Sequence, residues 1–353
     1  MIIFYFLLLG VMLYGAKFKL RTCHTDYMSK STTNATRGIF AFLIFMRHAF
    51  PYVTLGNIWL DTWFKSADKF LGQAIVCLFL FYTGFGIYES YKKNRSYFDT
   101  FLEQRLLKTL FNFDLAVMLF FVVQITVFQK FISLQELVKA LIGLSSLGNS
   151  NWYMFYIFIA YIIAFVSFKI SKKQDGIAII LVTVLTLIYI IYAKRSKIDL
   201  WWYDTALCVP LGMVYSFFKE RIDKFMSNAL AYYSVTLTVL LLYIGSTVIY
   251  FKTREEILIL TSRLAFTLAY VFVTMKISMN NKILAWLGKY SFAIYVMQRI
   301  PMMILQKYCL PEMNRYVFVL LSLVFTVLLS FLFGLLTDAA NKLFFSKTQK
   351  NLQ

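Results

Sequence analysis

The sequence predicts an all-α, polytopic membrane protein in which about ten or eleven transmembrane helices form one bundle. Hydrophobic residues make up 60% of the chain and charged residues 15%, whereas soluble domains carry about 25% charged residues. Long apolar runs alternate with short clusters of lysine and arginine, which is typical of chains that cross a membrane several times. No repeat, proline-rich linker or low-complexity tract interrupts this series, so we expect a single membrane domain.

Each long apolar run predicts one helix, because about 20 apolar residues are needed to cross a bilayer core about 30 Å thick. The runs lie at residues 1–16, 38–56, 71–88, 110–128, 152–168, 177–193, 204–218, 229–250, 257–275, 284–306 and 316–336. Residues 1–16 lack the basic start and the small-residue cleavage pattern of a signal peptide, which favours a retained helix. We expect an additional N-terminal helix and basic loop over residues 1–36, a membrane domain over 37–340 and a cytoplasmic tail over 341–353.

The distribution of charge sets the expected orientation. The formal net charge of +19 would indicate nucleic-acid binding if it lay on a soluble surface, but here the basic residues lie between apolar runs. The loops between the runs lie alternately on the two sides of the membrane. The side that holds the loop after residues 1–16 carries more lysine and arginine than the other side. Because basic loops tend to stay in the cytoplasm, we expect an external N-terminus, a cytoplasmic C-terminus and no nucleic-acid partner.

The cysteines and histidines predict neither a disulfide framework nor a metal centre. The cysteines form no CxxC pair, so we expect small buried hydrophobic side chains at Cys23, Cys77, Cys208 and Cys309. One of the two histidines, His24, lies in a basic polar loop, where we expect it to be solvated. The other has no second histidine or acidic residue near it in the sequence that could complete a metal site.

This other histidine, His48, is the most informative residue because it lies inside the apolar run 38–56, eleven residues after Arg37. At about 100° and 1.5 Å per residue, eleven steps return to within about 20° of the same helix face and place His48 roughly 16 Å deeper in the membrane. An ionisable residue at that depth is a functional candidate. It is either a general base for a hydroxyl substrate or a neutral histidine bonded to a neighbouring helix, and the residues alone leave both open.

Three further cations are candidates for a polar site. Arg105 and Lys108 are three residues apart, so on an α-helix they would present adjacent cations on one face at the cytoplasmic edge. Such a pair suits phosphate groups, although the same residues, like Arg37, also serve as helix-flanking anchors. Arg47 lies about 100° around the helix from His48, so it must face another polar surface or extend to the membrane interface.

A polar stripe marks one of the late helices. Its residues are spaced i, i+4 and i+7, which places them on one helix face: Ser291, Tyr295 and Gln298. The stripe either lines a substrate site or joins neighbouring helices, as polar residues in membrane bundles commonly do.

Six segments of the chain together carry a resemblance to a known family. They are Arg37-Gly-Ile with His48, 79–85 (FLFYTGF), Arg105-Leu-Leu-Lys108, 151–156 (NWYMFY), 211–213 (LGM) and 287–298 (LGKYSFAIYVMQ). In this order they resemble the membrane-bound acyltransferase family 3, the bacterial sugar O-acyltransferases, whose signatures include R-x10-H and R-x-x-R. The resemblance covers roughly residues 36–340. Thr83 stands where the family often has serine, Lys108 where it has arginine, and Gln298 where it often has histidine.

The resemblance implies transfer of an acyl group, most often acetyl, from cytoplasmic acyl-CoA to a hydroxyl of a cell-surface or lipid-linked polysaccharide at the bacterial inner membrane. His48, with Arg37 in the same catalytic site, would act as general base or carry the acyl group transiently. The CoA head would be bound by three cations, Arg37, Arg105 and Lys108. The substrate site would be lined by the polar stripe of Ser291, Tyr295 and Gln298. The partners would be acyl-CoA (acetyl-CoA as co-substrate), a carbohydrate or glycolipid acceptor and the lipid bilayer, with no metal.

Two other classes of membrane protein remain open. A polysaccharide polymerase or flippase would also be basic and rich in tyrosine, but it would need no CoA and would hold its important cations in external loops. A transporter would show an internal repeat, or helices broken by glycine and proline with carboxylates near the membrane centre. The excess of basic residues on the cytoplasmic side and the low number of prolines, four, favour the acyltransferase.

Overall fold

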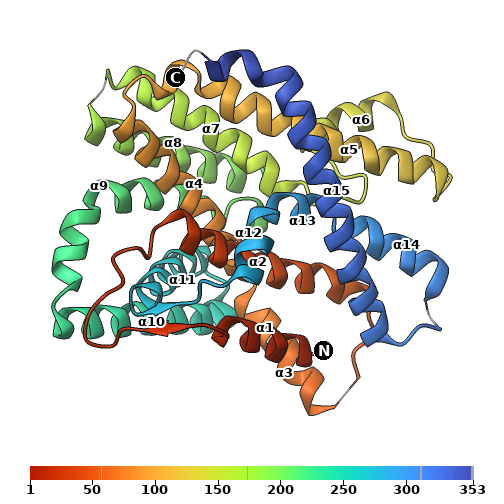
Figure 1. The fold of residues 1–353 in the computed structure, drawn as a ribbon, viewed down its shortest axis with the longest axis horizontal. Coiled ribbons are helices and arrows are strands. Elements are labelled where there is room, and N and C mark those ends of the chain that lie inside the picture. The colour runs from red at the N-terminus through yellow and green to blue at the C-terminus, as the bar shows by residue number, and fades with distance from the viewer. Residues whose placement is uncertain (57, 173, 311, 351–353) are drawn as a thin grey trace.

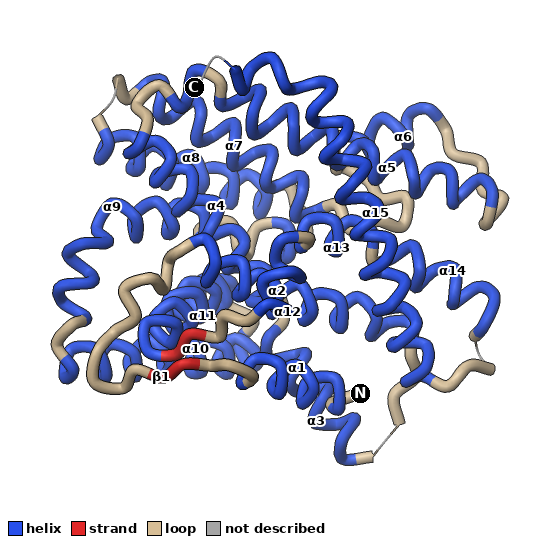
Figure 2. The backbone as a smooth tube through the Cα atoms, in the orientation of Figure 1, coloured by secondary structure: helices blue, strands red, loops and turns tan. Residues whose placement is uncertain are grey.

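The computed structural model describes residues 1–56, 58–172, 174–310 and 312–350, and most of them form helices (Figures 1 and 2). The α-helices are α1 (Ile3–Leu13), α2 (Lys30–Ala49), α3 (Trp59–Leu71), α4 (Ala74–Lys93), α5 (Lys108–Thr126), α6 (Leu134–Leu141), α7 (Trp152–Ile170), α8 (Asp175–Arg195), α9 (Cys208–Met226), α10 (Ala229–Thr253), α11 (Glu256–Lys276), α12 (Lys282–Lys289), α13 (Ser291–Met297), α14 (Arg299–Cys309) and α15 (Arg315–Lys350). The short elements are the 3₁₀-helices η1 (Phe50–Tyr52), η2 (Tyr97–Asp99) and η4 (Leu200–Trp202), the π-helix η3 (Leu102–Leu107), and the strands β1 (Lys17–Phe18) and β2 (Ile277–Ser278).

Seven stretches of helix in the described ranges are long and apolar enough to cross a membrane, and each overlaps one predicted run. They are Trp59–Lys93, Leu102–Thr126, Trp152–Ile170, Asp175–Arg195, Ala229–Thr253, Glu256–Lys276 and Arg315–Phe345. The prediction of an all-α, polytopic membrane protein is therefore confirmed. The last helix, α15, continues through residue 350 into the predicted tail, while residues 351–353 of that tail lie outside the described residues.

The other predicted runs are also helical, but they are shorter or more polar than a typical span. Residues 1–16 give only the short α1. The runs 38–56 and 204–218 overlap α2 and α9, whose sequences include several charged or hydroxyl side chains. Polarity within α2 is what a buried site in the bundle requires, because polar groups inside a membrane protein face its interior.

The structure differs from the prediction at the run 284–306, which is expected as one helix but is divided into α12, α13 and α14. The second break follows Met297 and lies three residues before Pro301. Proline has no N–H to donate to the carbonyl four residues earlier, and its ring crowds that carbonyl. The helix therefore breaks at Gln298, which lies at a junction between two helices.

The loop that carries His24 folds against α11, so the expectation of a solvated side chain is wrong. Strand β1 pairs antiparallel with β2, with Lys17 opposite Ser278. The amide of His24 donates to the carbonyl of Met275 (2.7 Å), and its Nε2 atom lies 3.1 Å from the carbonyl oxygen of Lys17. The side chain is 5% exposed. A strand pair of two residues leaves no alternating pattern in the sequence, so it could not be anticipated.

The thiols are free, and their burial follows the prediction for two of the four. Cys77 and Cys208 are buried, whereas Cys23 and Cys309 are partly buried. In the ranges that the structure describes, no group of three or more His, Cys, Asp or Glu side chains could hold a metal ion.

Helix α2 packs most extensively against α12, and both lie near the centre of the view in Figure 1. Two glycines allow this close crossing. A Cβ atom at Gly38 would lie 2.1 Å from the carbonyl oxygen of Leu284, and one at Gly288 would lie 1.7 Å from that of Asn34. Small residues let helix backbones approach each other in membrane bundles, and here only glycine fits.

A second pair of glycines joins α4 to α9 in the same way. A Cβ atom at Gly84 would lie 1.9 Å from the carbonyl oxygen of Val209, and one at Gly212 would lie 2.0 Å from that of Phe81. All four glycines belong to segments that carry the family resemblance. These segments therefore meet in pairs at two helix crossings, although they are far apart in the sequence.

Three ion pairs join elements on the side of the bundle at which α2 ends, which we call the η1 side. In each pair an arginine reaches a carboxylate whose side chain is at most 7% exposed. An unpaired ion in such an interior would cost several kcal/mol. The pairs are Arg47 with Asp68, Arg263 with Asp204 (Nε to Oδ2, 3.0 Å) and Arg315 with Asp61 (Nη1 to Oδ2, 2.6 Å). Of the two alternatives expected for Arg47, another polar surface or the membrane interface, the structure shows the first.

We expect Asp204→Ala to destabilise the protein strongly, because it leaves the Arg263 side chain, which is 6% exposed, without a carboxylate. Removing one partner of a buried pair costs about 3–5 kcal/mol. The thermal unfolding midpoint of the protein in detergent should fall clearly. The double variant Arg263→Leu with Asp204→Leu, which removes both charges, should recover most of that loss. A single variant as stable as the wild type would mean that the pair contributes nothing.

Candidate active site

Helix α2 carries both Arg37 and His48, as the sequence predicts. Ser29 caps its first turn, because the Ser29 hydroxyl accepts a hydrogen bond from the amide of Thr32 (3.3 Å). The helix is continuous over Lys30–Ala49. Over eleven residues a regular helix rises about 16 Å, so the two side chains share one face but lie at different depths.

His48 lies in the last turn of α2, partly buried between the start of α7 and the junction of α13 with α14. Its Nε2 atom is 3.4 Å from the Ser150 hydroxyl, and its ring centroid is 6.2 Å from that of Tyr295. Gln298 lies beside the same ring, but neither its Oε1 atom nor His48 Nδ1 has a hydrogen-bond partner of normal geometry among the described residues. Since a 3.4 Å contact is weak, neither ring nitrogen is held by a strong hydrogen bond within the described chain, although Nδ1 is buried and His48 is not among the residues that line the cavity described below.

A tight loop between α6 and α7 brings Ser150 to this histidine. Gln124 of α5 donates from Nε2 to the carbonyl of Leu147 (2.6 Å), and the Asn149 side chain accepts from the amide of Leu147 (2.9 Å). Gly148 has a φ of +108°, which favours glycine. The path of this part of the loop is therefore fixed by these hydrogen bonds and by the conformation of Gly148.

A cavity of about 710 Å³ lies along α2. The residues of α2 that line it are spaced three or four apart and form one helix face: Lys30, Thr33, Arg37, Ala41 and Ile44. His48 is the next residue on this face, four positions after Ile44. The cavity therefore follows α2 from its first turn, which we call the Lys30 side, to the layer next to His48.

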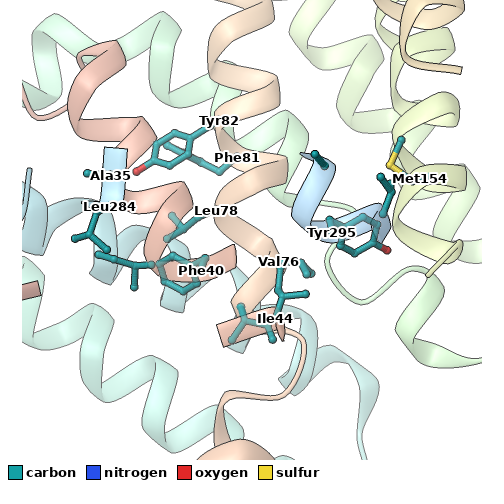
Figure 3. Close-up of a cluster of buried hydrophobic side chains, with 14 of the residues drawn as sticks. Ala35, Phe40, Ile44, Val76, Leu78, Phe81, Tyr82, Met154, Leu284 and Tyr295 are labelled. Atoms are coloured by element: carbon teal, nitrogen blue, oxygen red, sulfur yellow. The ribbon is translucent and has the colours of Figure 1, made fainter. Parts of the chain in front are cut away.

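Part of the cavity wall is apolar and aromatic. Ile44 of α2, Val76 of α4 and Met154 of α7 line it together with Tyr295 of α13, and Figure 3 shows these side chains in the central cluster of buried hydrophobic residues. The Tyr295 ring packs edge-on against Tyr153 with centroids 5.1 Å apart. Its hydroxyl is buried without a partner in the described chain, so it can donate to a ligand that reaches this part of the cavity.

Two of the three predicted CoA-binding cations line the cavity. The guanidinium carbon of Arg37 is 5.8 Å from the ring centroid of Tyr82, and Arg105 donates from Nε to the Tyr97 hydroxyl (2.8 Å). Neither arginine forms an ion pair with a carboxylate in the described ranges. Two cations without counterions in one cavity favour an anionic ligand.

Lys108 is not among the residues that line the cavity. The preceding segment, Leu102–Leu107, is a π-helix, whose wider turn does not keep the α-helical angle between positions three apart. Two lysines that sequence analysis did not single out, Lys30 and Lys93, do line the cavity. The spacing of seven residues between Lys30 and Arg37, which is two helical turns, is the signal that could have found Lys30.

Two of the three residues in the predicted polar stripe line the cavity, and the third lies beside His48. Ser291 and Tyr295 line the cavity, whereas Gln298 does not. Gln298 is 0% exposed, lies beside His48 and donates from Nε2 to the carbonyl of Tyr295 (3.1 Å). The break between α13 and α14 therefore separates the last member of the stripe from the first two.

The comparison with known protein families agrees with this geometry. A family model described as an acyltransferase domain matches residues 33–335, a range that contains both glycine crossings, His48 and every cavity-lining residue except Met28 and Lys30. Neither a curated protein nor a solved structure matches the chain. Since the family model covers most of the sequence, the chain belongs to acyltransferase family 3 and is a multi-pass membrane acyltransferase.

Proposed function

We propose that this acyltransferase moves an acyl group, most often acetyl, from cytoplasmic acyl-CoA to a hydroxyl of a cell-surface or lipid-linked polysaccharide. The observation that carries this proposal is the course of the cavity, which follows one face of α2 from Lys30 past Arg37 to Ile44, next to His48. Acyl-CoA has phosphates at one end and a thioester at the end of a long, thin arm. A cavity with cations near one end and an imidazole beyond the other suits that shape.

In this proposal Arg37 and Arg105 hold the phosphates of CoA, because arginine forms paired hydrogen bonds to phosphate oxygens. Lys30 and Lys93 add charge along the same cavity. Lys108 lies outside the cavity lining, so it would contact only a part of the CoA head that projects beyond it. The Lys30 side would then face the cytoplasm, in agreement with the predicted orientation in the bacterial inner membrane.

At the other end, His48 would take the proton of the acceptor hydroxyl while the hydroxyl oxygen attacks the thioester carbonyl. The tetrahedral intermediate then collapses, the C–S bond breaks, and the thiolate of CoA leaves and receives the proton from His48. The hydroxyl of Tyr295, which has no partner within the described chain, would donate to the oxyanion. A route in which His48 first carries the acyl group and then passes it to the acceptor uses the same atoms. Arg37 belongs to the proposed site because it lies on the same face of α2 as His48. Ser291 belongs to it because its side chain lines the cavity.

We expect Arg37→Ala and Arg105→Ala each to raise the KM for acetyl-CoA by about 10- to 100-fold, the equivalent of one lost hydrogen bond to a charged group. The measurement is transfer of labelled acetyl from acetyl-CoA into membrane glycans, with protein levels matched. Arg195→Ala, which removes an exposed cation at the end of α8, is the control and should leave KM unchanged. If the wild type transfers no label and deletion of the protein alters glycan chain length, a polysaccharide polymerase or flippase is the better assignment.

A further inference from the structure

Arg299 lies next to His48 but away from the cavity. It directly follows Gln298, and it is not among the residues that line the cavity. Its guanidinium Nη1 donates to the carbonyl of Gly148 at 3.5 Å. Two residues further along the same loop, the Ser150 hydroxyl lies 3.4 Å from His48 Nε2. One short loop therefore touches both Arg299 and His48, on the η1 side of the site.

Arg299 lacks the counterion that comparable arginines have. On the η1 side, three other arginines that are at least partly buried each pair with a buried carboxylate, as described above. Within the part of the chain that the structure describes, Arg299 pairs with none. Its hydrogen bond to Gly148 is long, and its buried Nε atom has no partner in those same described residues. A cation inside a membrane bundle is costly unless it is paired, so an anionic ligand would complete its surroundings.

Two side-chain amides beside Arg299 are also incompletely bonded. Gln124 donates from Nε2 to Leu147, and Asn149 accepts at Oδ1. Among the described residues, the buried Oε1 of Gln124 and the buried Nδ2 of Asn149 have no partner. Both flank Gly148, whose carbonyl accepts from Arg299. One free acceptor and one free donor match a sugar hydroxyl, which can both donate and accept.

From these contacts we propose that the acceptor is an anionic glycan, and that Arg299 binds its carboxylate or phosphate while the amides of Gln124 and Asn149 bind its hydroxyls. This inference rests on the proposed function. It places the donor and the acceptor on opposite sides of His48: CoA in the cavity on the Lys30 side, and the acidic sugar on the η1 side. The hydroxyl to be acylated then lies between Arg299 and the imidazole.

If Arg299 instead stabilised the oxyanion formed from the thioester, the expected effect of its loss would be different. An oxyanion donor acts on the acyl carbonyl, so its loss lowers kcat for every acceptor alike. An acceptor-binding arginine discriminates between acceptors, because its loss affects those that carry a negative group and spares neutral ones.

The test measures binding of three sugars to the full-length protein in detergent, from the rise of the thermal unfolding midpoint with ligand concentration. The probes are methyl β-D-glucuronide, D-glucose 6-phosphate and the neutral methyl β-D-glucoside. We expect wild type to bind at least one acidic probe about tenfold or more tightly than the neutral one, and Arg299→Gln to lose that preference. Comparison of the two acidic probes identifies the carboxylate or the phosphate as the group preferred.

Two further variants keep the test decisive. Lys307→Gln removes an exposed cation from the same helix and should keep the preference for the acidic probe. Arg299→Lys retains the charge and should keep part of it. Equal binding of acidic and neutral probes by wild type, or a preference that survives in Arg299→Gln, would overturn the inference. Stabilisation by acetyl-CoA is measured separately, and its absence would count against the proposed function, whatever the sugars do.

Discussion

Replacing His48 by alanine should abolish acyl transfer while the protein remains folded. General acid–base catalysis contributes about 10²- to 10⁴-fold to a rate. If His48 is instead an obligatory acyl carrier, its loss removes the whole reaction. The fold should tolerate the change because alanine favours the helix and because, among the residues that the structure describes, the imidazole makes one long hydrogen bond, to Ser150. The measurement is the initial rate of label transfer from acetyl-CoA to membrane glycans at equal protein level.

Ser150, which contacts His48, provides the matched comparison for His48→Ala. Ser150→Ala removes the same 3.4 Å contact but leaves the imidazole in place, so we expect a loss of about tenfold or less. Added imidazole should restore part of the activity of His48→Ala if the residue acts as a base, and acetyl-CoA without acceptor should label the wild-type protein itself if it acts as a carrier. Transfer by His48→Ala at the wild-type rate would reduce His48 to a structural histidine.

The features that could be predicted from the sequence depend on short-range regularities. Apolar runs identified the membrane fold, since the length of a bilayer-crossing helix is fixed by the bilayer. The angle per residue of a helix placed Arg37 and His48 on one face of α2. The same regularity failed where the helix was irregular: at the π-helix before Lys108 and at the break before Gln298.

Partners that lie far apart in the chain could not be predicted in the same way. The sequence contains Arg47 and Arg299 as two similar cations in or beside apolar runs, and nothing local distinguishes them. The structure gives Arg47 a carboxylate, Asp68, and gives Arg299 none within the described residues. Likewise, each motif glycine is visible in the sequence, but its function as one half of a helix crossing depends on a segment from another part of the chain.

Gly38→Ala, at the crossing of α2 with α12, should both destabilise the protein and alter the geometry of the site. The added Cβ atom would lie 2.1 Å from the carbonyl oxygen of Leu284, where contacts below 3.0 Å are essentially never seen. Backbone cannot rotate away as a side chain can, so α2 and α12 must separate by about 1 Å. Overpacking of this kind costs about 1–3 kcal/mol. We expect a lower thermal unfolding midpoint and less protein in the membrane.

The control for this substitution is Gly245→Ala on α10, where no described atom outside the nearby backbone of the helix lies within 4 Å of the new Cβ atom. Because alanine favours a helix over glycine by up to about 1 kcal/mol, this variant should be as stable as the wild type or slightly more stable. A Gly38→Ala protein with the stability of Gly245→Ala would mean that α2 and α12 do not cross as closely as described.

Activity should respond to Gly38→Ala as well as stability, because the crossing sets the width of the site. Arg37 is the neighbour of Gly38 on α2, and Ser291 and Tyr295 follow directly after α12 on α13, so both walls of the cavity extend from this one contact. Separation of the helices would move the cations of α2 away from the hydroxyls of α13. In the fraction that folds, we expect a raised KM for acetyl-CoA and a reduced kcat. We therefore expect the glycine next to Arg37 to support the same proposed site as the arginine, by setting the distance between the two walls of the cavity.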